Sequence, residues 1–284
     1  MVVTAYRPAT LAEALRIRAA ERAIPMAGGT DLMVKHRRHA GLAPKFERPI
    51  LFLGHLDELR YVRRHEEGEL PGLEIGAATT LTDLLMAAET PAALRQAIAE
   101  MAAPAIRNAA TLAGNVCNAS PAGDTLPALY CFDAQVVLAR SGGERRLDIA
   151  RFIRGPGQTD LGDDELVRAV VLPLVPFDRM LYRKVGTRRA NALSKLSFLG
   201  LARLDGDIVR DMRCAFGAVA PTVVRCRALE ARCINLPRQA LAAQRADLLA
   251  GYAELIVPIR DQRSSAEYRR AVALRLLSQF LSDL

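Results

Sequence analysis

The sequence predicts an α+β protein with at least two domains. In the N-terminal part, short apolar segments of strand length alternate with helix-start signals, in which Ser or Thr precedes an acidic residue by three positions. The pattern changes after 175–182, a stretch that carries Pro176 and Asp178. We therefore expect domains at 1–176 and 177–284. With 51% apolar and 25% charged residues, the 284-residue chain has too much apolar sequence for wholesale disorder.

The N-terminal part contains the more clearly bounded elements. Thr10 with Glu13 and Thr80 with Asp83 have capping-box spacing and mark two helix starts. Helices are predicted over 8–21, 81–89, Pro91 to Pro104, and 124–132. Strands are predicted within 23–34, 48–56, 73–81, 133–140 and 164–174, with a hairpin return at 142–149.

The C-terminal part combines a hairpin with helices. Two strands are predicted within 193–221 around the turn dipeptide Asp205-Gly206. Helices dominate from 227 on, and Ser264 with Glu267 is spaced to cap a helix over 264–281. This order of elements predicts an antiparallel sheet with helices in a smaller second domain.

Charge narrows the classes of partner. The formal net charge is +8, but no dense Lys/Arg run with interleaved aromatic residues occurs, so we expect no nucleic-acid partner. The densest basic stretch is 34–41; a solvated helix end is its ordinary explanation and a phosphate contact is the alternative.

The cysteines and histidines form no recognisable catalytic or metal-binding pattern. The five cysteines lack the C-x-x-C spacing of metal or iron–sulfur sites, and the odd number argues against a disulfide framework. None of the four histidines pairs with Ser or Cys at a telling spacing. We expect no catalytic and no metal-ligating residues, no membrane span, and a cytoplasmic location with reduced thiols.

Two glycine-containing stretches are candidates for a ligand site. The first, "PMAGGTDLMV" at 25–34, places Gly28 and Gly29 between two apolar runs, and consecutive amides in such a turn can bind an anion. Taken alone, it is more simply a strand-to-helix turn. The second, "TLAGNVCNASPAGD" at 111–124, has more short polar groups than a core or linker needs. Because no G-x-G-x-x-G or P-loop motif occurs, a Rossmann or P-loop site is disfavoured.

Together these stretches resemble the FAD-binding (medium) subunit of molybdenum hydroxylases, the carbon monoxide dehydrogenase medium subunit and xanthine dehydrogenase FAD-binding subunit family. Further segments resemble that family in the same order along nearly the whole chain, namely "IRNAATLAGN", "DELVRAVVLP", "YRKVGTRRANALSKLS", "GAVAPTVVRCRALE" and "IRDQRSSAEYRRAVALRLL". The resemblance implies a vanillyl-alcohol-oxidase (PCMH)-type FAD-binding domain of two α+β subdomains, followed by the smaller C-terminal domain.

The resemblance also implies a set of flavin-contacting positions. The first wall around the FAD pyrophosphate would be Met26, Ala27, Gly28, Gly29, Thr30, Asp31 and Leu32. The second wall would be Thr111, Leu112, Ala113, Gly114 and Asn115. Contacts to the ribityl and phosphate region would come from Asn118 and Asp124, and contacts to the flavin from Leu172, Lys184 and Leu193. Without the resemblance, Lys184 would be taken for a solvated lysine.

Two positions bear on how FAD would bind. The family often has two glycines before the Asn, whereas Ala113 replaces the first here, and its methyl could narrow the approach to the pyrophosphate. No histidine follows the first glycine turn directly, and His36 lies six residues beyond Thr30. We therefore expect non-covalent FAD.

The implied function is electron transfer within a heteromeric enzyme. The molybdenum cofactor would lie on a large partner subunit and two [2Fe–2S] clusters on a small one, in a dimer of heterotrimers. The electron acceptor would be NAD, dioxygen, or a quinone or cytochrome. The stretch 186–191 is equally an exposed loop or a contact to a partner or acceptor. Two alternatives stay open: a free-standing FAD-dependent oxidase or dehydrogenase of a small alcohol, and a basic nucleic-acid-binding module.

Overall fold

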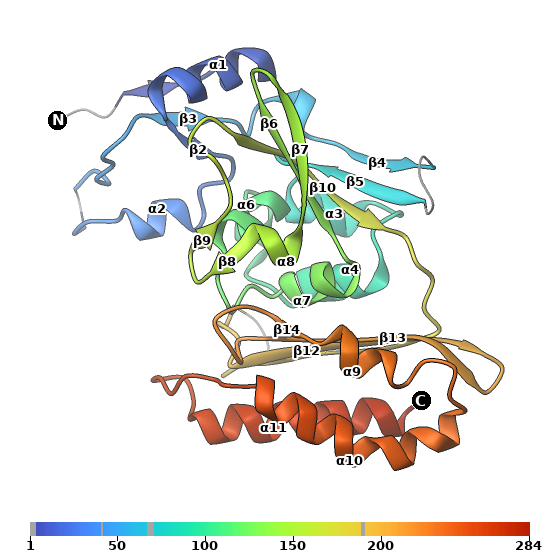
Figure 1. Ribbon diagram of the computed structural model, residues 1–284. Helices are drawn as coiled ribbons and strands as arrows, with labels where there is room; N and C mark the ends of the chain where they lie inside the picture. Colours follow the sequence, from blue (N-terminus) through green and yellow to red (C-terminus); the bar gives the residue numbers. More distant parts are fainter. Residues whose placement is uncertain (1–3, 41, 67–70, 189–190) are drawn as a thin grey trace. The chain divides into compact units, whose positions relative to one another are not determined.

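The computed structural model describes residues 4–40, 42–66, 71–188 and 191–284. It has mixed α+β architecture, as predicted, and divides into two compact units (Figure 1). Unit 1 comprises Met1–Thr90, Ala102–Ala119 and Asp133–Pro173. Unit 2 comprises Pro91–Met101, Ser120–Phe132 and Leu174–Leu284.

Unit 1 contains three sheets. A parallel sheet has the order β1-β3-β2, and an antiparallel sheet has the order β4-β5-β10-β6-β7; β8 and β9 form a small separate pair. The strands are β1 (Ala5–Tyr6), β2 (Ile24–Met26), β3 (Ile50–Phe52), β4 (Val62–His65), β5 (Gly72–Gly76), β6 (Gln135–Arg140), β7 (Gly143–Asp148), β8 (Ile153–Gly155), β9 (Gln158–Thr159) and β10 (Leu166–Pro173).

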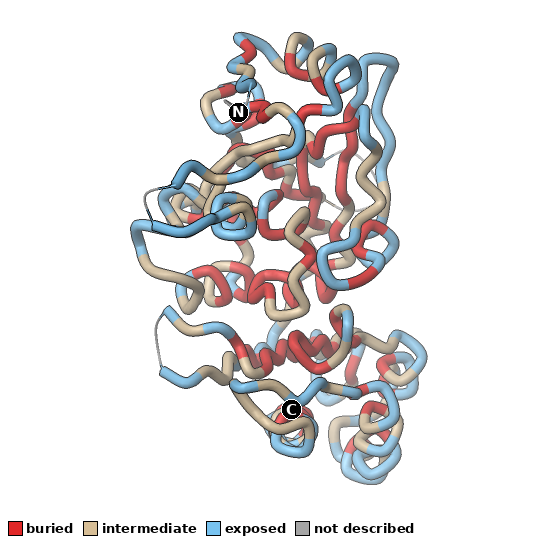
Figure 2. Tube along the Cα trace, turned by 90° about the vertical axis from the view of Figure 1, so that its left-hand side faces the viewer, coloured by how far each residue is buried: buried red, intermediate tan, exposed pale blue. Residues whose placement is uncertain are grey.

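The helices of unit 1 are short apart from the first. They are α1 (Leu11–Glu21), α2 (Leu32–Lys35), the 3₁₀ turn η1 (Asp57–Leu59), α3 (Leu81–Met86), α5 (Pro104–Arg107), α6 (Leu112–Asn118) and α8 (Ile149–Phe152). Ala14 of α1 packs with Leu51 and Leu53 in a buried apolar cluster, so α1 covers the small parallel sheet. Figure 2 shows buried residues following the strands and the helices that cover them.

Unit 2 is built in three layers around an antiparallel sheet of order β11-β12-β13-β14 (Figure 1). The strands are β11 (Arg179–Val185), β12 (Leu196–Asp205), β13 (Ile208–Gly217) and β14 (Val224–Arg225). Helices α4 (Ala92–Ala99) and α7 (Leu126–Cys131) lie on one face. Helices α10 (Arg238–Leu255) and α11 (Ala266–Ser282) lie on the other, and α9 (Arg227–Ala231) follows β14.

Aromatic side chains fill the core of unit 2. The ring centroids of Phe198 on β12 and Phe216 on β13 are 4.9 Å apart, and those of Phe198 and Phe280 are 6.0 Å apart. Tyr252 of α10 lies 5.2 Å from Phe216, centroid to centroid. These spacings are typical of tilted and edge-to-face aromatic pairs, which lock helices α10 and α11 onto the sheet.

Local helix signals are mostly confirmed. The hydroxyl of Thr10 accepts a hydrogen bond from the amide of Glu13, and Thr80 with Asp83 forms a complete capping box. The predicted N-cap of α11 is wrong by one residue. The hydroxyl of Ser265, not that of Ser264, accepts a hydrogen bond from the amide of Tyr268 (3.2 Å). Ser264 instead forms a bridge with Asp261, which fixes its backbone in the turn before the helix.

The predicted helix from Pro91 to Pro104 is also wrong in extent. Helix α4 ends at Ala99, and α5 begins at Pro104. Ala102 has a left-handed backbone with φ of 50°, which interrupts the helix between them. Pro104 opens the next turn, where its missing amide hydrogen costs nothing.

Candidate functional site

The first glycine stretch is the turn between β2 and α2. Gly29 has φ of +69°, a conformation that favours glycine, and its carbonyl accepts from the amide of Met33 at 2.9 Å. Gly28 is required for a different reason. A Cβ at Gly28 would lie 1.8 Å from the carbonyl oxygen of Ala109, so two backbone segments touch at this point. The two glycines thus set the turn and allow a close backbone approach.

The second stretch begins as a helix rather than as an open loop. Thr111 is the N-cap of α6, and its hydroxyl accepts a hydrogen bond from the amide of Gly114 at 3.0 Å. Residues Thr80 and Thr111 form an antiparallel bridge, and the amide of Leu81 donates to the carbonyl of Ala110 (2.8 Å). Since Ala109 lies two residues before Thr111, the Gly28 contact brings the first glycine stretch next to the start of the second, within unit 1.

The start of α6 has the features that an anionic group needs. The amides of Leu112 and Ala113 have no intrahelical acceptor, because they belong to the first turn. A Cβ at Gly114 would meet only the hydroxyl of Thr111 within 4 Å, so the backbone there is open to approach. Ala113, whose methyl could narrow the approach to a pyrophosphate, is 4% exposed. These residues fit a pyrophosphate bound by backbone amides.

A buried charged cluster in unit 2 contains two more of the predicted residues. The Lys184 ammonium lies 2.7 Å from an Asp124 carboxylate oxygen and donates to the carbonyl of Glu100 at 3.0 Å. The hydroxyl of Ser194 donates to the other Asp124 oxygen. The side chains of Lys184 and Asp124 are 5% and 7% exposed, so this ion pair is shielded from water.

Burial and pairing shift the pKa of the Asp124 carboxyl in opposite directions. Burial raises the pKa of the Asp124 carboxyl, while the Lys184 charge and the hydrogen bonds from Lys184 and Ser194 lower it. The net direction is upward, which means that the folded unit does not fully compensate for the carboxylate's lost hydration. The partners of Asp124 therefore determine how much of it is ionised.

The remaining predicted residues have varied environments. Leu172 is 0% exposed within β10, whereas Leu193 is 67% exposed in the segment after β11. Asn118 is half-buried at the end of α6. Half-buried positions of the β2–α2 turn are Met26, Ala27, Gly28, Gly29, Thr30 and Leu32, and Asp31 is exposed. In the predicted stretch 186–191, residues 189 and 190 lie outside the described part.

The sequence did not predict Ser194 as part of this buried cluster. It is 0% exposed and follows Leu193 directly, but its partner Asp124 lies 70 residues away in the sequence. No spacing rule connects the two, and a serine in this segment gives no local signal.

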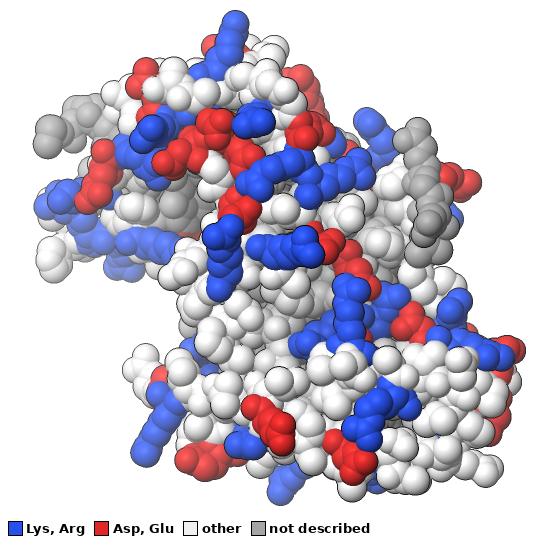
Figure 3. Space-filling model, in the orientation of Figure 1, with Lys and Arg blue, Asp and Glu red and all other residues white. Residues whose placement is uncertain are grey.

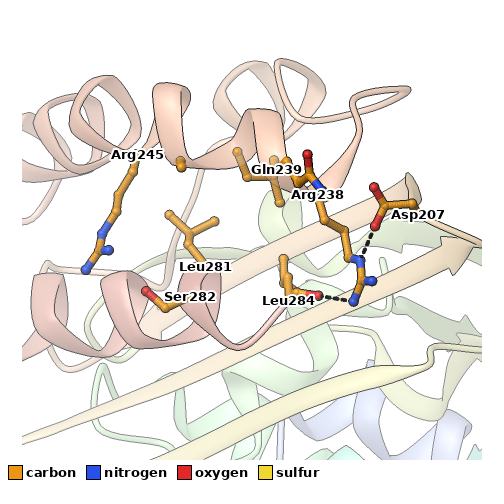
Figure 4. A pocket seen from close by; sticks show the side chains of 9 residues that line it. Asp207, Arg238, Gln239, Arg245, Leu281, Ser282 and Leu284 are labelled. Atoms are coloured by element: carbon orange, nitrogen blue, oxygen red, sulfur yellow. Dashed lines mark hydrogen bonds and ion pairs between the residues drawn. The ribbon is translucent and has the colours of Figure 1, made fainter.

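A separate pocket of about 430 Å³ lies in unit 2, between the β12–β13 turn, the start of α10 and the end of α11 (Figure 4). Arg238 points at Asp207, with an ion-pair distance of 2.7 Å, and also donates to the carbonyl of Leu284 at 2.7 Å. Because these polar groups bind each other, they are not aimed at a ligand. The pocket is a gap between helix ends with no sign of chemistry.

Burial lowers the reactivity of three of the five thiols. Burial raises the pKa of Cys117 to about 12 and that of Cys233 to about 11. Burial also raises the pKa of Cys214 well above its ordinary value. All five cysteines are free. Among the described residues, no three His, Cys, Asp or Glu side chains group in a way that would hold a metal ion.

The protein has α+β architecture with a glycine turn and a helix start that fit a pyrophosphate, and comparison with known proteins identifies its family. Residues 1–175 match the profile "FAD binding domain in molybdopterin dehydrogenase", and 181–284 match "CO dehydrogenase flavoprotein C-terminal domain". The chain belongs to the family of FAD-binding subunits of the molybdenum hydroxylases. It is thus an oxidoreductase subunit with an FAD-binding domain.

Relatives and solved structures agree with this assignment. The chain is 32% identical to the xanthine dehydrogenase FAD-binding subunit of Escherichia coli O157:H7, over 98% of this chain and 94% of that one. It is 29% identical to the glyceraldehyde dehydrogenase medium chain of Sulfolobus acidocaldarius, over 94% and 92%. Its fold is similar to a chain in the crystal structure of the Cu,Mo-CO dehydrogenase, with a TM-score of 0.85, 24% identity, and coverage of 99% and 98%.

Within the described residues, no helix is long and apolar enough to cross a membrane. The longest helices, α10 and α11, each contain several charged residues and pack on the sheet of unit 2.

Proposed function

We propose that this chain is the electron-transfer subunit of a heteromeric molybdenum hydroxylase. It would receive electrons from [2Fe–2S] clusters on a small partner subunit and deliver them to NAD, dioxygen, or a quinone or cytochrome. Substrate oxidation would occur at the molybdenum cofactor of a large partner subunit, in a cytoplasmic dimer of heterotrimers. Membership of the FAD-binding subunit family supports this proposal.

The main support for this assignment of the FAD site is that the two glycine stretches lie next to each other. Gly28 packs against the backbone of Ala109, two residues before the N-cap Thr111. We assign the pyrophosphate of FAD to the backbone amides of the β2–α2 turn and of the first turn of α6. Bound there without a covalent bond, FAD would supply the chain with one- and two-electron redox chemistry.

The buried cluster of unit 2 has a supporting role in this proposal. The resemblance implies that Asp124 contacts the ribityl and phosphate region of FAD and that Lys184 contacts the flavin; in the structure Asp124 binds both Lys184 and Ser194. In this proposal, Asp124 holds the Lys184 ammonium in a fixed place and pairs with its positive charge. Leu172, Leu193 and Asn118 complete the proposed set of contacts, and the domain division near residue 176 belongs to the same proposal.

Flavin content and partner chains test the proposal separately. Purified protein should carry one FAD per chain, and acid precipitation should release the yellow colour into the supernatant. A colourless protein that takes up no FAD would refute the flavin assignment, and colour in the pellet would refute non-covalent binding. Co-purification with two further chains should follow. Its absence would instead favour a free-standing FAD enzyme.

A further inference from the structure

Arg269, near the start of α11, is a buried cation outside the site described above. Figure 3 shows that Lys and Arg side chains of this basic chain commonly lie on the surface, but the side chain of Arg269 is 1% exposed. Its Nη2 donates to the Asp261 carboxylate at 2.6 Å, and its Nη1 donates to the carbonyl of Ala218 at 3.3 Å. Because burying a charge is costly, Arg269 depends on the carboxylate that pairs with it.

Asp261 binds a second arginine in the same way. Its carboxylate accepts hydrogen bonds from Nε and Nη2 of Arg263 at 3.0 and 2.7 Å, and from the Arg263 amide at 2.9 Å. These hydrogen bonds, together with the one from Arg269, lower the pKa of the Asp261 carboxyl, so it is ionised at neutral pH. One carboxylate therefore fixes two guanidinium groups beside the start of α11.

The Arg269 branch reaches the segment 120–124 through Ala218. This residue directly follows β13 and has φ of 60°, a left-handed conformation that is uncommon for alanine. Its amide donates to the carbonyl of Pro121 at 2.7 Å, and its carbonyl accepts from Arg269. Strained backbone persists only where the surroundings hold it, and here both polar groups of the strained residue are bonded.

The Arg263 branch reaches the same segment through Ser194. Nη1 of Arg263 lies 3.5 Å from the carbonyl oxygen of Ser194, and the ammonium of the next residue, Lys195, lies 5.4 Å from the centre of the Tyr268 ring on α11. The Ser194 hydroxyl in turn donates to Asp124. Residues of both branches belong to unit 2, and the branches end on one segment.

We propose that Asp261 is a positioning residue for bound FAD, because it fixes both of the neighbours that hold the segment 120–124. The proposal rests on the proposed function, in which Asp124 contacts the ribityl and phosphate region. A carboxylate has about four acceptor sites, and among the described residues Lys184 and Ser194 use two of those on Asp124. The others can accept hydrogen bonds from FAD once the segment is held in place.

Two substitutions in the full-length chain test this role. Asp261→Asn keeps the shape of the side chain and removes the charge that holds both arginines. Arg263→Gln is the milder variant, because it leaves the ion pair of Asp261 with Arg269 in place and removes the contact to the Ser194 carbonyl.

Asp211→Asn is the matched control within unit 2. The side chain of Asp211 is 20% exposed, against 21% for Asp261, and it also pairs with an arginine. That partner, Arg213, likewise donates to a backbone carbonyl, the one of Cys131 at 2.7 Å. The control therefore breaks a similar ion pair that holds a different segment.

Urea unfolding, titration with FAD and visible circular dichroism of the bound flavin are measured for each chain. We expect Asp261→Asn and Arg263→Gln to raise the Kd for FAD about tenfold, the equivalent of one hydrogen bond, and to change the circular dichroism of the flavin. The control should lose stability and still bind FAD with the wild-type Kd and spectrum. Hydrogen exchange at the Ala218 amide should be faster in Asp261→Asn than in the control.

The proposal is overturned by wild-type FAD affinity and flavin spectrum in Arg263→Gln, by equal effects in the control, or by unchanged exchange at Ala218 in a folded Asp261→Asn. If Asp261→Asn does not fold, the result for Arg263→Gln decides. If the wild-type chain takes up no FAD, the proposed function fails first and the positioning role fails with it.

Discussion

The Lys184–Asp124 pair gives a prediction whose size follows from the structure. Lys184→Met keeps most of the side-chain volume and removes the charge 2.7 Å from Asp124. The carboxylate, 7% exposed, is then left with Ser194 as its partner, and the Glu100 carbonyl loses a donor. Removing one member of a buried ion pair costs about 3–5 kcal/mol of stability, so we expect the free energy of unfolding of Lys184→Met to be lower than that of the wild type by this amount at neutral pH.

The loss should depend on pH in a defined direction. Without Lys184, burial raises the pKa of Asp124 further above its value in the unfolded chain, about 3.9. Between these two pKa values the folded variant holds a proton that the unfolded chain has released. Its free energy of unfolding therefore falls by about 1.4 kcal/mol per pH unit as pH rises through this window, and is level above it. The deficit relative to wild type should be smaller at acidic than at neutral pH.

Urea unfolding at several pH values between about 5 and 8 measures this effect. The chain has no Trp, so far-UV circular dichroism is the suitable signal. The double variant K184M/D124N, which removes both charges, should recover most of the lost stability. A deficit that does not change with pH, or a double variant as unstable as K184M, would refute the reasoning.

Three further predictions concern the glycine stretches. Gly28→Ala places a Cβ 1.8 Å from the Ala109 carbonyl oxygen, so it should lower the free energy of unfolding by about 1–3 kcal/mol and remove most of the bound flavin. An unchanged urea midpoint together with an unchanged flavin content would contradict this. Gly29→Val, at φ of +69°, should leave a folded protein without FAD, and stoichiometric FAD in this variant would rule out the loop assignment. Thr111→Ala removes the cap of α6 and should cost about 1 kcal/mol in urea unfolding, whereas Thr111→Ser should match wild type; equal losses would exclude capping.

Features fixed by neighbouring residues were predictable from sequence. The capping box of Thr80 and Asp83 is present in full, and the Asp205-Gly206 turn joins β12 and β13 with Gly206 at φ of 58°. In each case the physical cause lies within four residues of the effect.

Features that depend on tertiary contacts were not predictable. Helix α6 contains Gly114 and two asparagines, all weak helix formers, and it forms because Leu112 and Val116 are fully buried. The pairing of Lys184 with Asp124 joins residues 60 positions apart, so sequence reasoning placed both near a flavin but not against each other.

The alternation of the two units along the chain has a consequence for biosynthesis. Unit 2 draws α4 and α7 from the middle of the sequence, while its sheet comes from residues after 174. Every residue of α7, Leu126–Cys131, is buried in the finished protein, yet α7 leaves the ribosome before β12 exists to cover it. The nascent chain thus carries an exposed apolar helix until synthesis reaches the hairpin. A fragment that starts at the matched C-terminal segment would lack this helix and leave the same face of the sheet bare.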